Sequence, residues 1–434
     1  MRLKSSAPAR AGHPRPRLMT LLTVGAVTLG FAGFGVVMTA DPALADPTCQ
    51  EIAAGSDTTQ DVMNQYSVDL TGNLLCSFNA VDPVTGSQTT NIEYIKGLNA
   101  TEPATTCLEQ RPNGSTAGLV GLRESINPST TATPALSPVV PQGCVDITMS
   151  SSGPTSNTAG ALTFIPFAED AVTGAIGPAA GGTVQGINGP VTTVATQLGG
   201  GANDFTITDL KTLYASCGEV TENGTTYWPF EVGATQPSGT QRIDLYVPQA
   251  GSGTLKFWAS ELGFTATALP ACVFQTIQQG TANGTSVEEH NGTAVGTDPD
   301  GYMPFSIAQW ISQSVHTTGD AVDLDRRYGA VLQDIGGVSP FSGTRMNTAF
   351  PFNREVYNIV EGCRVDSTAP LPFTGATCSL DPLLVSMLVG TGGSLCQDEL
   401  TIINYGFALL VNNTNEPDTC GSIAPALRSQ PPPV

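Results

Sequence analysis

The chain has 434 residues, of which 37 are acidic and 17 are basic, and 40% of its residues are hydrophobic. The excess of negative charge argues against nucleic acid and anionic lipid as partners. The length exceeds that of one ordinary domain and favours two lobes with separate cores.

The first segment, residues 1–45, has the pattern of a secretory signal peptide. A basic stretch precedes an uncharged apolar run at residues 18–40, and Ala43-Leu44-Ala45 forms a small-x-small cleavage site. The run is also long enough to span a bilayer, so a retained anchor is the alternative. We expect cleavage and a secreted, extracellular protein, with association with the cell envelope as the alternative. The mature chain then has 12 basic and 36 acidic residues, a net charge of −24.

All ten cysteines follow this segment. An even number of cysteines in an exported chain favours disulfides. No C-x-x-C pair occurs, and only His290 and His316 remain as mature histidines, so we expect no metal site. We expect cysteines that are neighbours in sequence to pair: Cys49 with Cys76, Cys107 with Cys144, Cys217 with Cys272, Cys363 with Cys378, and Cys396 with Cys420.

Two hydroxyl-rich turns in the first third of the chain precede patterns of helical spacing. Residues 55–59 (GSDTT) lead into apolar side chains four apart, at Val62, Tyr66 and Leu70. Residues 114–116 (GST) lead into Leu119, Leu122 and Ile126. Each pattern predicts an amphipathic helix that begins at the turn.

Two later turns follow patterns of strand alternation. The first strand pattern, at residues 145–149, ends in residues 150–154 (SSSGP). The second, at residues 243–247, ends in residues 251–254 (GSGT), after which Leu255, Trp258 and Leu262 predict a helix. Helix N-termini attract anions, and ligands of open α/β sheets bind at the carboxyl ends of strands. The four turns therefore predict a site for a small oxyanion.

The order of these motifs resembles the phosphate-type solute-binding proteins of ABC importers, the PstS-like group in its actinobacterial form. The resemblance covers nearly the whole mature chain. It rests on GSDTTQDVMNQY, RPNGSTAG, DITMSSSGP, LTFIPFAEDAVTGA, FTITDLKTLYASC, YVPQAGSGT and EEHNGT…MPFSIAQWI. It implies an α/β, two-lobed periplasmic-binding-protein-like (type II) fold with a ligand cleft between the lobes. It also implies a monomer that binds phosphate or a related oxyanion, without a cofactor, and serves an ABC permease.

The resemblance also implies a division of the chain. Residues 46–155 and 340–425 would form lobe I, residues 156–339 would form lobe II, and residues 426–434 would be a disordered tail. Residues 162–167 would cross between the lobes, and FPFNREVYNIV would return a strand to lobe I.

The motifs indicate the ligand-binding residues as Thr58, Thr59, Gln60, Ser115, Thr116, Ser151, Ser252, Gly253 and Thr254. Ser151 stands where phosphate binders of the family have an aspartate, and Pro248 stands where they have an arginine. The resemblance therefore predicts a site without a positive clamp or proton acceptor, and weak phosphate binding with poor discrimination against sulfate. Arg111 and Arg242 are the candidates to restore the clamp.

Enzyme signatures are missing from the sequence. No G-x-S-x-G elbow occurs, and His290, in EEHNGT, is expected in a solvated loop. Trp258 and Trp310 could line a sugar cleft, but their apolar surroundings favour core packing. We expect a binding protein without catalytic activity. The alternative is a secreted structural or adhesive protein that keeps the fold and has lost its ligand.

Overall fold

The computed structural model describes most of the chain that follows the predicted signal peptide, which itself lies outside the described residues. None of the helices in this part is both long and apolar enough to cross a membrane. The described residues are 48–80, 91–97, 105–127, 140–155, 159–177, 204–316, 325–373, 376–410 and 419–429.

Lobe I is built on one end of the main sheet, in the strand order β3-β2-β6-β16-β7. Strand β2 is parallel to both β3 and β6, whereas β16 is antiparallel to β6 and β7. The late strand β16 is thus inserted between two early ones, as the sequence predicted for FPFNREVYNIV. The strands are β2 (Glu51–Gly55), β3 (Leu75–Ser77), β6 (Ile147–Ser150), β7 (Leu162–Ile176) and β16 (Asn353–Glu361).

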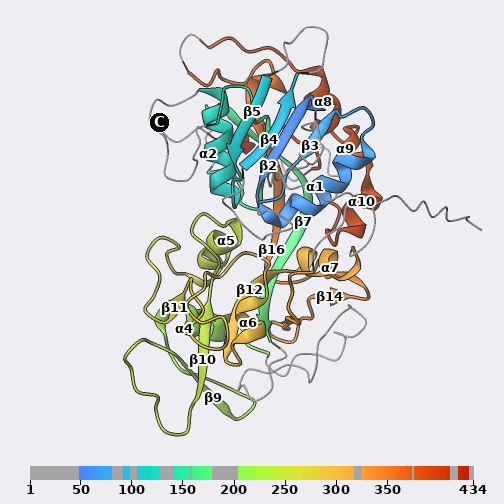
Figure 1. The fold of residues 1–434 in the computed structure, drawn as a ribbon. Helices are drawn as coiled ribbons and strands as arrows, with labels where there is room; N and C mark the ends of the chain where they lie inside the picture. The colour runs from blue at the N-terminus through green and yellow to red at the C-terminus, as the bar shows by residue number, and fades with distance from the viewer. Residues whose placement is uncertain are drawn as a thin grey trace, which may run out of the picture. The chain divides into compact units, whose positions relative to one another are not determined.

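Lobe II continues the same sheet from β7. Strand β10 is parallel to β9, β11 and β12, and β7 is antiparallel to β12 and β13. Strands β7 and β16 run side by side from one lobe into the other (Figure 1). The strands are β8 (Val220–Glu222), β9 (Thr225–Pro229), β10 (Gln241–Tyr246), β11 (Val273–Phe274), β12 (Gly301–Ser306) and β13 (Val331–Leu332).

Helices and small strands cover this sheet. The helices are α1 (Asp57–Asp69), α2 (Ser115–Ile126), α4 (Ile207–Ser216), α5 (Gly253–Leu262), α6 (Thr293–Thr297), α7 (Ile307–Val315), α8 (Pro382–Leu388), α9 (Ser394–Gln397) and α10 (Glu399–Asn404). The remaining strands are β1 (Thr48–Cys49), β4 (Asn91–Lys96), β5 (Thr105–Gln110), β14 (Phe341–Ser342), β15 (Arg345–Met346) and β17 (Arg428–Ser429).

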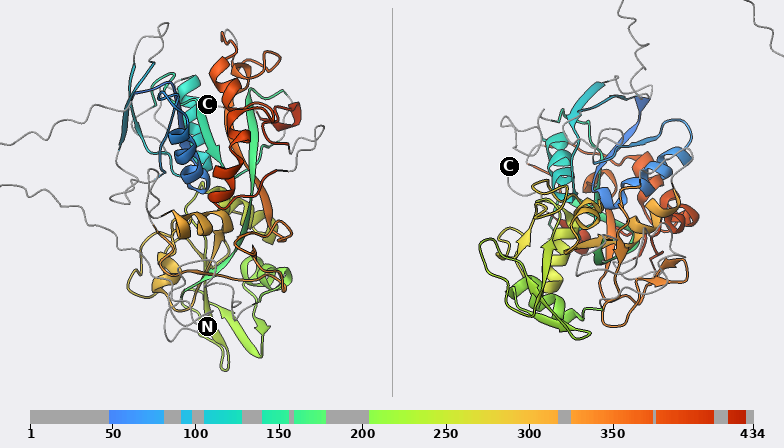
Figure 2. Two further views of the ribbon diagram at one scale, coloured as in Figure 1. Left: turned by 90° about the vertical axis from the view of Figure 1, so that its right-hand side faces the viewer. Right: turned by 60° about the horizontal axis from the view of Figure 1, so that its bottom comes forward.

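Separate hydrophobic cores define the two lobes. Lobe II has one core built from side chains between Ala171 and Phe352, and lobe I has two, built from earlier and later parts of the chain. Figure 2 shows by colour which chain segments make up each lobe: blue, cyan and red segments lie in one lobe, and yellow-green to orange segments lie in the other. Trp258 and Trp310 are fully buried in the lobe II core, which confirms that they pack helices. The predicted two-lobed α/β fold is confirmed.

The helix starts follow the hydroxyl-rich turns. Ser56 caps α1 by accepting a hydrogen bond from the Thr58 amide, and Ser252 caps α5 by accepting one from the Leu255 amide. Helix α2 begins after Gly114, whose φ of 96° suits glycine. The turn at residues 150–154 differs from the other three, because no helix begins at it among the described residues before the crossing strand β7.

The five predicted disulfides are all present: Cys49–Cys76, Cys107–Cys144, Cys217–Cys272, Cys363–Cys378 and Cys396–Cys420. The prediction of a disordered tail is wrong for residues 426–429. Arg428 and Ser429 form β17 on the edge of β7, and Arg428 is buried and paired with Asp366. Residues 430–434 lie outside the described residues.

Candidate functional site

The turns of the two lobes are in direct contact. The Thr116 amide of lobe I donates a hydrogen bond of 3.2 Å to the Gly251 carbonyl of lobe II. A Cβ atom on Gly253 would lie 2.2 Å from Ser151 Oγ and 2.6 Å from Ser115 Oγ, so any larger residue there would force these hydroxyls to move. In this structure the expected cleft is a closed boundary between the lobes.

Serine hydroxyls line the lobe I side of this boundary. Ser151 Oγ lies 3.2 Å from Ser56 Oγ and 3.4 Å from Ser115 Oγ, and the Ser151 amide donates to Ser115 Oγ. All three side chains are buried. The turns before α1, after β6 and at the start of α2 therefore meet at one place, as the motif order predicted.

The carboxylate of Glu289, in lobe II, accepts hydrogen bonds from the N-terminal turns of two helices at the boundary. Glu289 Oε1 accepts hydrogen bonds from the Thr254 amide, at 3.1 Å, and from Thr58 Oγ1, at 3.3 Å. Thr254 lies in the first turn of α5 and Thr58 in the first turn of α1, where the helix dipoles favour negative charge. Glu289 is 3% exposed. One oxyanion oxygen, that of Glu289, is thus already bound where the two lobes meet.

A buried arginine lies beside this carboxylate. Arg354 Nη2 donates to Thr254 Oγ1 at 2.9 Å, and its Nε and Nη2 donate to Asp170 Oδ2 at 3.1 and 2.8 Å. Arg354 and Asp170 are directly opposed in the pairing of β16 with β7. Asp170 Oδ1 accepts from Ser306 Oγ and the Ala308 amide at the start of α7, so the guanidinium is held in place. The prediction of a site without a positive clamp is wrong.

The two arginines proposed as replacements lie elsewhere. Arg111 Nη1 donates to the Asn79 carbonyl at 3.0 Å. Arg242 makes a bidentate ion pair with Asp244, at 2.8 and 2.9 Å, and stacks over Phe230.

Three ionisable side chains meet at the boundary: Asp57 from α1, and Glu289 and His290 from the loop before α6. Burial raises the pKa of Asp57 to about 7. Burial, reinforced by the charge of Asp57, raises the pKa of Glu289 to about 7. Burial lowers the pKa of His290 to about 4, so its ring is neutral at pH 7. His290 is 0% exposed, so the prediction of a solvated loop is wrong.

The candidate residues divide into two groups. Thr58, Ser115, Thr116, Ser151, Gly253 and Thr254 meet at the lobe boundary, where Thr116 Oγ1 also accepts from Lys256 Nζ of lobe II. The other three have different surroundings. Gln60 Oε1 accepts from the Ala80 amide within lobe I, Ser252 caps α5, and Thr59 Oγ1 is buried without a partner among the described residues.

The sequence-based reasoning missed Asp57, Asp170, Glu289, His290 and Arg354. One signal was available for two of them. Asp170 and Arg354 are charged residues inside otherwise apolar strand patterns, and opposite charges in two crossing strands predict a buried pair. No comparable signal marks Glu289 and His290, which lie in a polar segment.

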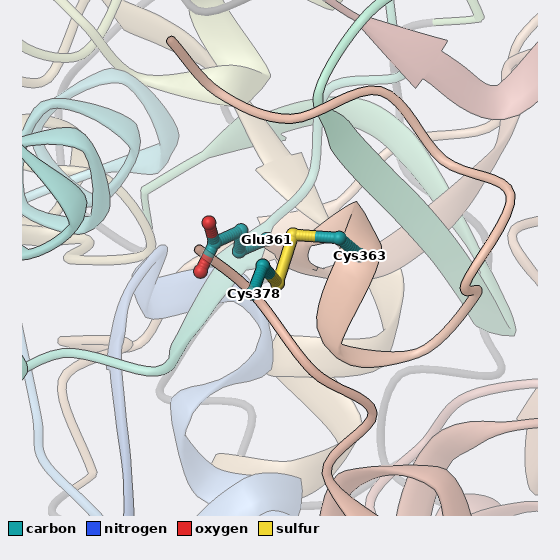
Figure 3. Close-up of side chains that lie close together, drawn as sticks. All are labelled: Glu361, Cys363 and Cys378. Carbon is teal, nitrogen blue, oxygen red and sulfur yellow. A yellow bond between two sulfur atoms is a disulfide. The ribbon is translucent and has the colours of Figure 1, made fainter. Parts of the chain in front are cut away.

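A second group of potential metal ligands lies in lobe I, at Glu361, Cys363 and Cys378. Figure 3 shows the two sulfur atoms joined to each other beside the Glu361 carboxylate. Because a metal-binding cysteine must be a thiolate, the disulfide removes two of the three potential ligands. This group has a structural role.

Comparisons with known proteins give no match to a protein family and no match among curated proteins. Among solved structures, a phosphate ABC transporter substrate-binding protein from Clostridium perfringens, with bound phosphate, is 11% identical, with a TM-score of 0.41, and the match covers 83% of this chain and 100% of that one. A phosphate transport receptor from Vibrio cholerae is 14% identical, with a TM-score of 0.36 and coverages of 83% and 99%. PstS from Borrelia burgdorferi is 11% identical, with a TM-score of 0.34 and coverages of 84% and 99%.

Proposed function

We propose that this chain is a solute-binding protein that holds a small oxyanion, phosphate or a related anion, between its two lobes. We further propose that it is secreted, acts as a monomer and delivers the anion to an ABC permease. The five disulfides support an exported protein.

The observation that carries the proposal is the position of the Glu289 carboxylate. A carboxylate is itself an oxyanion, and here it accepts hydrogen bonds from the first turns of α1 and α5, which belong to different lobes. Backbone amides and hydroxyls at helix N-termini bind anions without a charged side chain. The donors that hold Glu289 Oε1 are therefore suited to an oxygen of a ligand that displaces it.

Arg354 adds the charge that a tight anion site needs. Its guanidinium already donates to Thr254 Oγ1, and Asp170 fixes its orientation. Hydrogen bonds between charged groups are about twice as strong as neutral ones. With Arg354 in place, the reason for expecting weak phosphate binding no longer holds.

Ligand binding requires Glu289 to leave the position that the anion takes. The apparent dissociation constant is then the intrinsic value divided by the fraction of molecules in which the position is open. Removing the carboxylate makes that fraction larger and also removes a negative charge. Glu289→Ala should therefore bind phosphate more tightly than the wild type, by about tenfold or more, the equivalent of one hydrogen bond to a charged group.

The test is isothermal titration calorimetry of phosphate into the wild type and Glu289→Ala, in buffer freed of divalent metals. Glu288→Ala is the matched control, because it removes the neighbouring carboxylate, which accepts a hydrogen bond from Asn113 Nδ2. We expect binding by the wild type, tighter binding by Glu289→Ala, and little change in Glu288→Ala.

Weaker binding by Glu289→Ala than by the wild type would overturn the displacement of Glu289. If none of the three proteins binds phosphate, sulfate or a phosphonate, the oxyanion function is wrong. The alternative, a secreted structural or adhesive protein without a ligand, would then be favoured.

A further inference from the structure

Three side chains with metal-binding atoms converge at the lobe boundary. A carboxylate oxygen of Asp57, a carboxylate oxygen of Glu289 and a ring nitrogen of His290 all lie within 4.8 Å of one another, and all three residues are buried. Asp57 comes from the first turn of α1 in lobe I, whereas the other two come from lobe II. The group therefore joins the lobes.

One atom of each side chain lacks a hydrogen-bond partner. Asp57 Oδ1, Glu289 Oε2 and His290 Nδ1 are all buried, and none has a partner among the described residues while both carboxylates are ionised. A proton shared between the Asp57 and Glu289 carboxylates would pair the two oxygens but not the histidine nitrogen. His290 Nδ1 lies 3.4 Å from Asp57 Oδ2, outside hydrogen-bond geometry. Leaving a buried polar atom unpaired costs about 1–3 kcal/mol, so three in one place call for an explanation.

The other atoms of the same side chains are held in place. Glu289 Oε1 is bound by Thr254 and Thr58, and His290 Nε2 lies 3.4 Å from Thr254 Oγ1. Gln313 Nε2 donates to the His290 carbonyl, and His290 has a φ of 51°, which is uncommon outside glycine. Outer contacts that orient a histidine ring and a carboxylate are typical of metal ligands. Strained backbone of this kind is concentrated at functional sites.

The arginines near Asp57 and Glu289 pair with other carboxylates. Arg354 pairs with Asp170, and Arg326 Nη2 lies 3.7 Å from Asp61 Oδ2. Among the described residues, neither the Asp57 nor the Glu289 carboxylate forms an ion pair with an arginine or lysine, and the charges of Arg326 and Lys256 act on them only from farther away. A divalent cation would neutralise both and would remove the repulsion between them.

We propose that Asp57, Glu289 and His290 form a binding site for a divalent transition-metal ion, with Zn²⁺ as a representative, that links the two lobes. One nitrogen and two carboxylate oxygens suit zinc better than Mg²⁺ or Ca²⁺, which prefer oxygen ligands alone. Bonds of about 2.0–2.2 Å place the ligand atoms of a tetrahedral ion roughly 3.3–3.5 Å apart, so small side-chain rotations bring these atoms to the required spacing.

Sequence patterns did not reveal this site because Asp57 lies far along the chain from the adjacent residues Glu289 and His290. The expectation of no metal site rested on the absence of C-x-x-C and paired histidines. The proposal does not depend on the oxyanion function, because the metal is tested without phosphate. It concerns Glu289 Oε2, whereas the oxyanion proposal concerns the donors that hold Glu289 Oε1.

The experiment is calorimetry of Zn²⁺ with the purified protein, in a phosphate-free buffer with a large excess of Mg²⁺ to occupy exposed carboxylates. The test variants are Glu289→Gln, which keeps the shape of the side chain, and His290→Asn, because asparagine tolerates positive φ. The controls are Glu361→Gln, beside the Cys363–Cys378 disulfide, and His316→Asn, whose ring stacks on Tyr405.

We expect a single tight zinc ion per chain, an affinity at least about tenfold lower in Glu289→Gln and His290→Asn, and wild-type affinity in both controls. Zinc should also raise the Tm of the wild type and the two controls, but not that of the test variants. The proposal is overturned if the wild type binds no zinc under these conditions. It is equally overturned if folded test variants, checked by circular dichroism, bind zinc as tightly as the controls.

Discussion

Two buried groups of charged side chains differ in how completely their polar atoms are paired. The first, the Arg364 cluster, lies in lobe I and consists of Glu51, Lys96, Asp146, Arg364 and Asp381. Arg364 donates to all three carboxylates, Lys96 donates to Asp146, and backbone amides complete the pairing of Asp146 and Asp381. None of these five described residues has a buried side-chain nitrogen or oxygen without a partner.

The second group, the lobe-boundary cluster, consists of Asp57, Thr254, Glu289, His290 and Arg354. Three of its members each have a buried atom without a partner. A fully paired buried network fixes a single structure, whereas unpaired buried atoms mark a place where something else can bind. On this difference we base the proposal that the first cluster is structural and the second binds a ligand.

The largest effect is expected for Arg364→Met. It leaves the buried Glu51 and Asp146 and the partly buried Asp381 without their shared partner, and breaking a buried ion pair in this way costs about 3–5 kcal/mol. Urea unfolding followed by circular dichroism measures the loss. The control is Arg345→Met, because Arg345 is exposed on β15 and its change should stay within about 0.5 kcal/mol. Equal stability of the two variants would show that the Arg364 cluster is not structural.

The second prediction concerns pH and Glu51. Burial, reinforced by the charge of Asp146, raises the pKa of Glu51 from 4.5 to about 9. Between about pH 5 and pH 9 the folded protein therefore holds a proton that the unfolded chain has lost, so this group makes stability fall as pH rises. Glu51→Gln should remove that fall and exceed the wild type in stability at pH 8 by at least about 1.4 kcal/mol, the equivalent of one pKa unit.

Unfolding curves of the wild type and Glu51→Gln at pH 5 and pH 8 measure this effect. The two proteins should be closest in stability at pH 5, where Glu51 is protonated in the folded state. A difference that stays constant with pH would mean that Glu51 is ionised in the folded protein.

In the lobe-boundary cluster, Arg354→Lys should affect binding more than stability. Lysine keeps a positive charge near Asp170 but loses the planar guanidinium that reaches both Asp170 and Thr254. Phosphate affinity should fall by about 10–100-fold, the equivalent of about 1.5–3 kcal/mol for a hydrogen bond to a charged group. Calorimetry measures it, with Arg345→Lys as the control. Unchanged affinity in Arg354→Lys would place this arginine outside the ligand site.

The smallest effect is expected for Thr254→Val. It removes the hydroxyl that accepts from Arg354 but keeps the backbone amide, so binding should weaken by about 0.5–1.5 kcal/mol, the value of one neutral hydrogen bond. Thr221→Val, at an exposed hydroxyl in β8, is the control. A variant that melts much earlier yet binds phosphate normally would make Thr254 a structural residue.

Local features of the sequence predicted much of the fold. The starts of α1, α2 and α5 follow from hydroxyl-rich turns before helical spacing, because a capping hydroxyl and an apolar stripe are both local signals. The pairing of the cysteines was also predicted correctly.

The lobe-boundary cluster depends on contacts between distant parts of the chain. Arg354 reaches Thr254, a hundred residues earlier, because β16 pairs with β7 in a register that places Arg354 opposite Asp170. Glu289 and His290 are buried because the opposite lobe covers their loop, and their polar segment alone predicts exposure. Sequence patterns of single segments contain neither fact.

The central claim, that an oxyanion replaces the Glu289 carboxylate at the lobe boundary, is tested most directly by a crystal structure of the protein grown with phosphate and without divalent metals. The account predicts a phosphate within hydrogen-bond distance of the Thr254 amide and the Arg354 guanidinium, with Glu289 Oε1 no longer bound to Thr254. A phosphate bound elsewhere, with Glu289 Oε1 still accepting from the Thr254 amide, would contradict it.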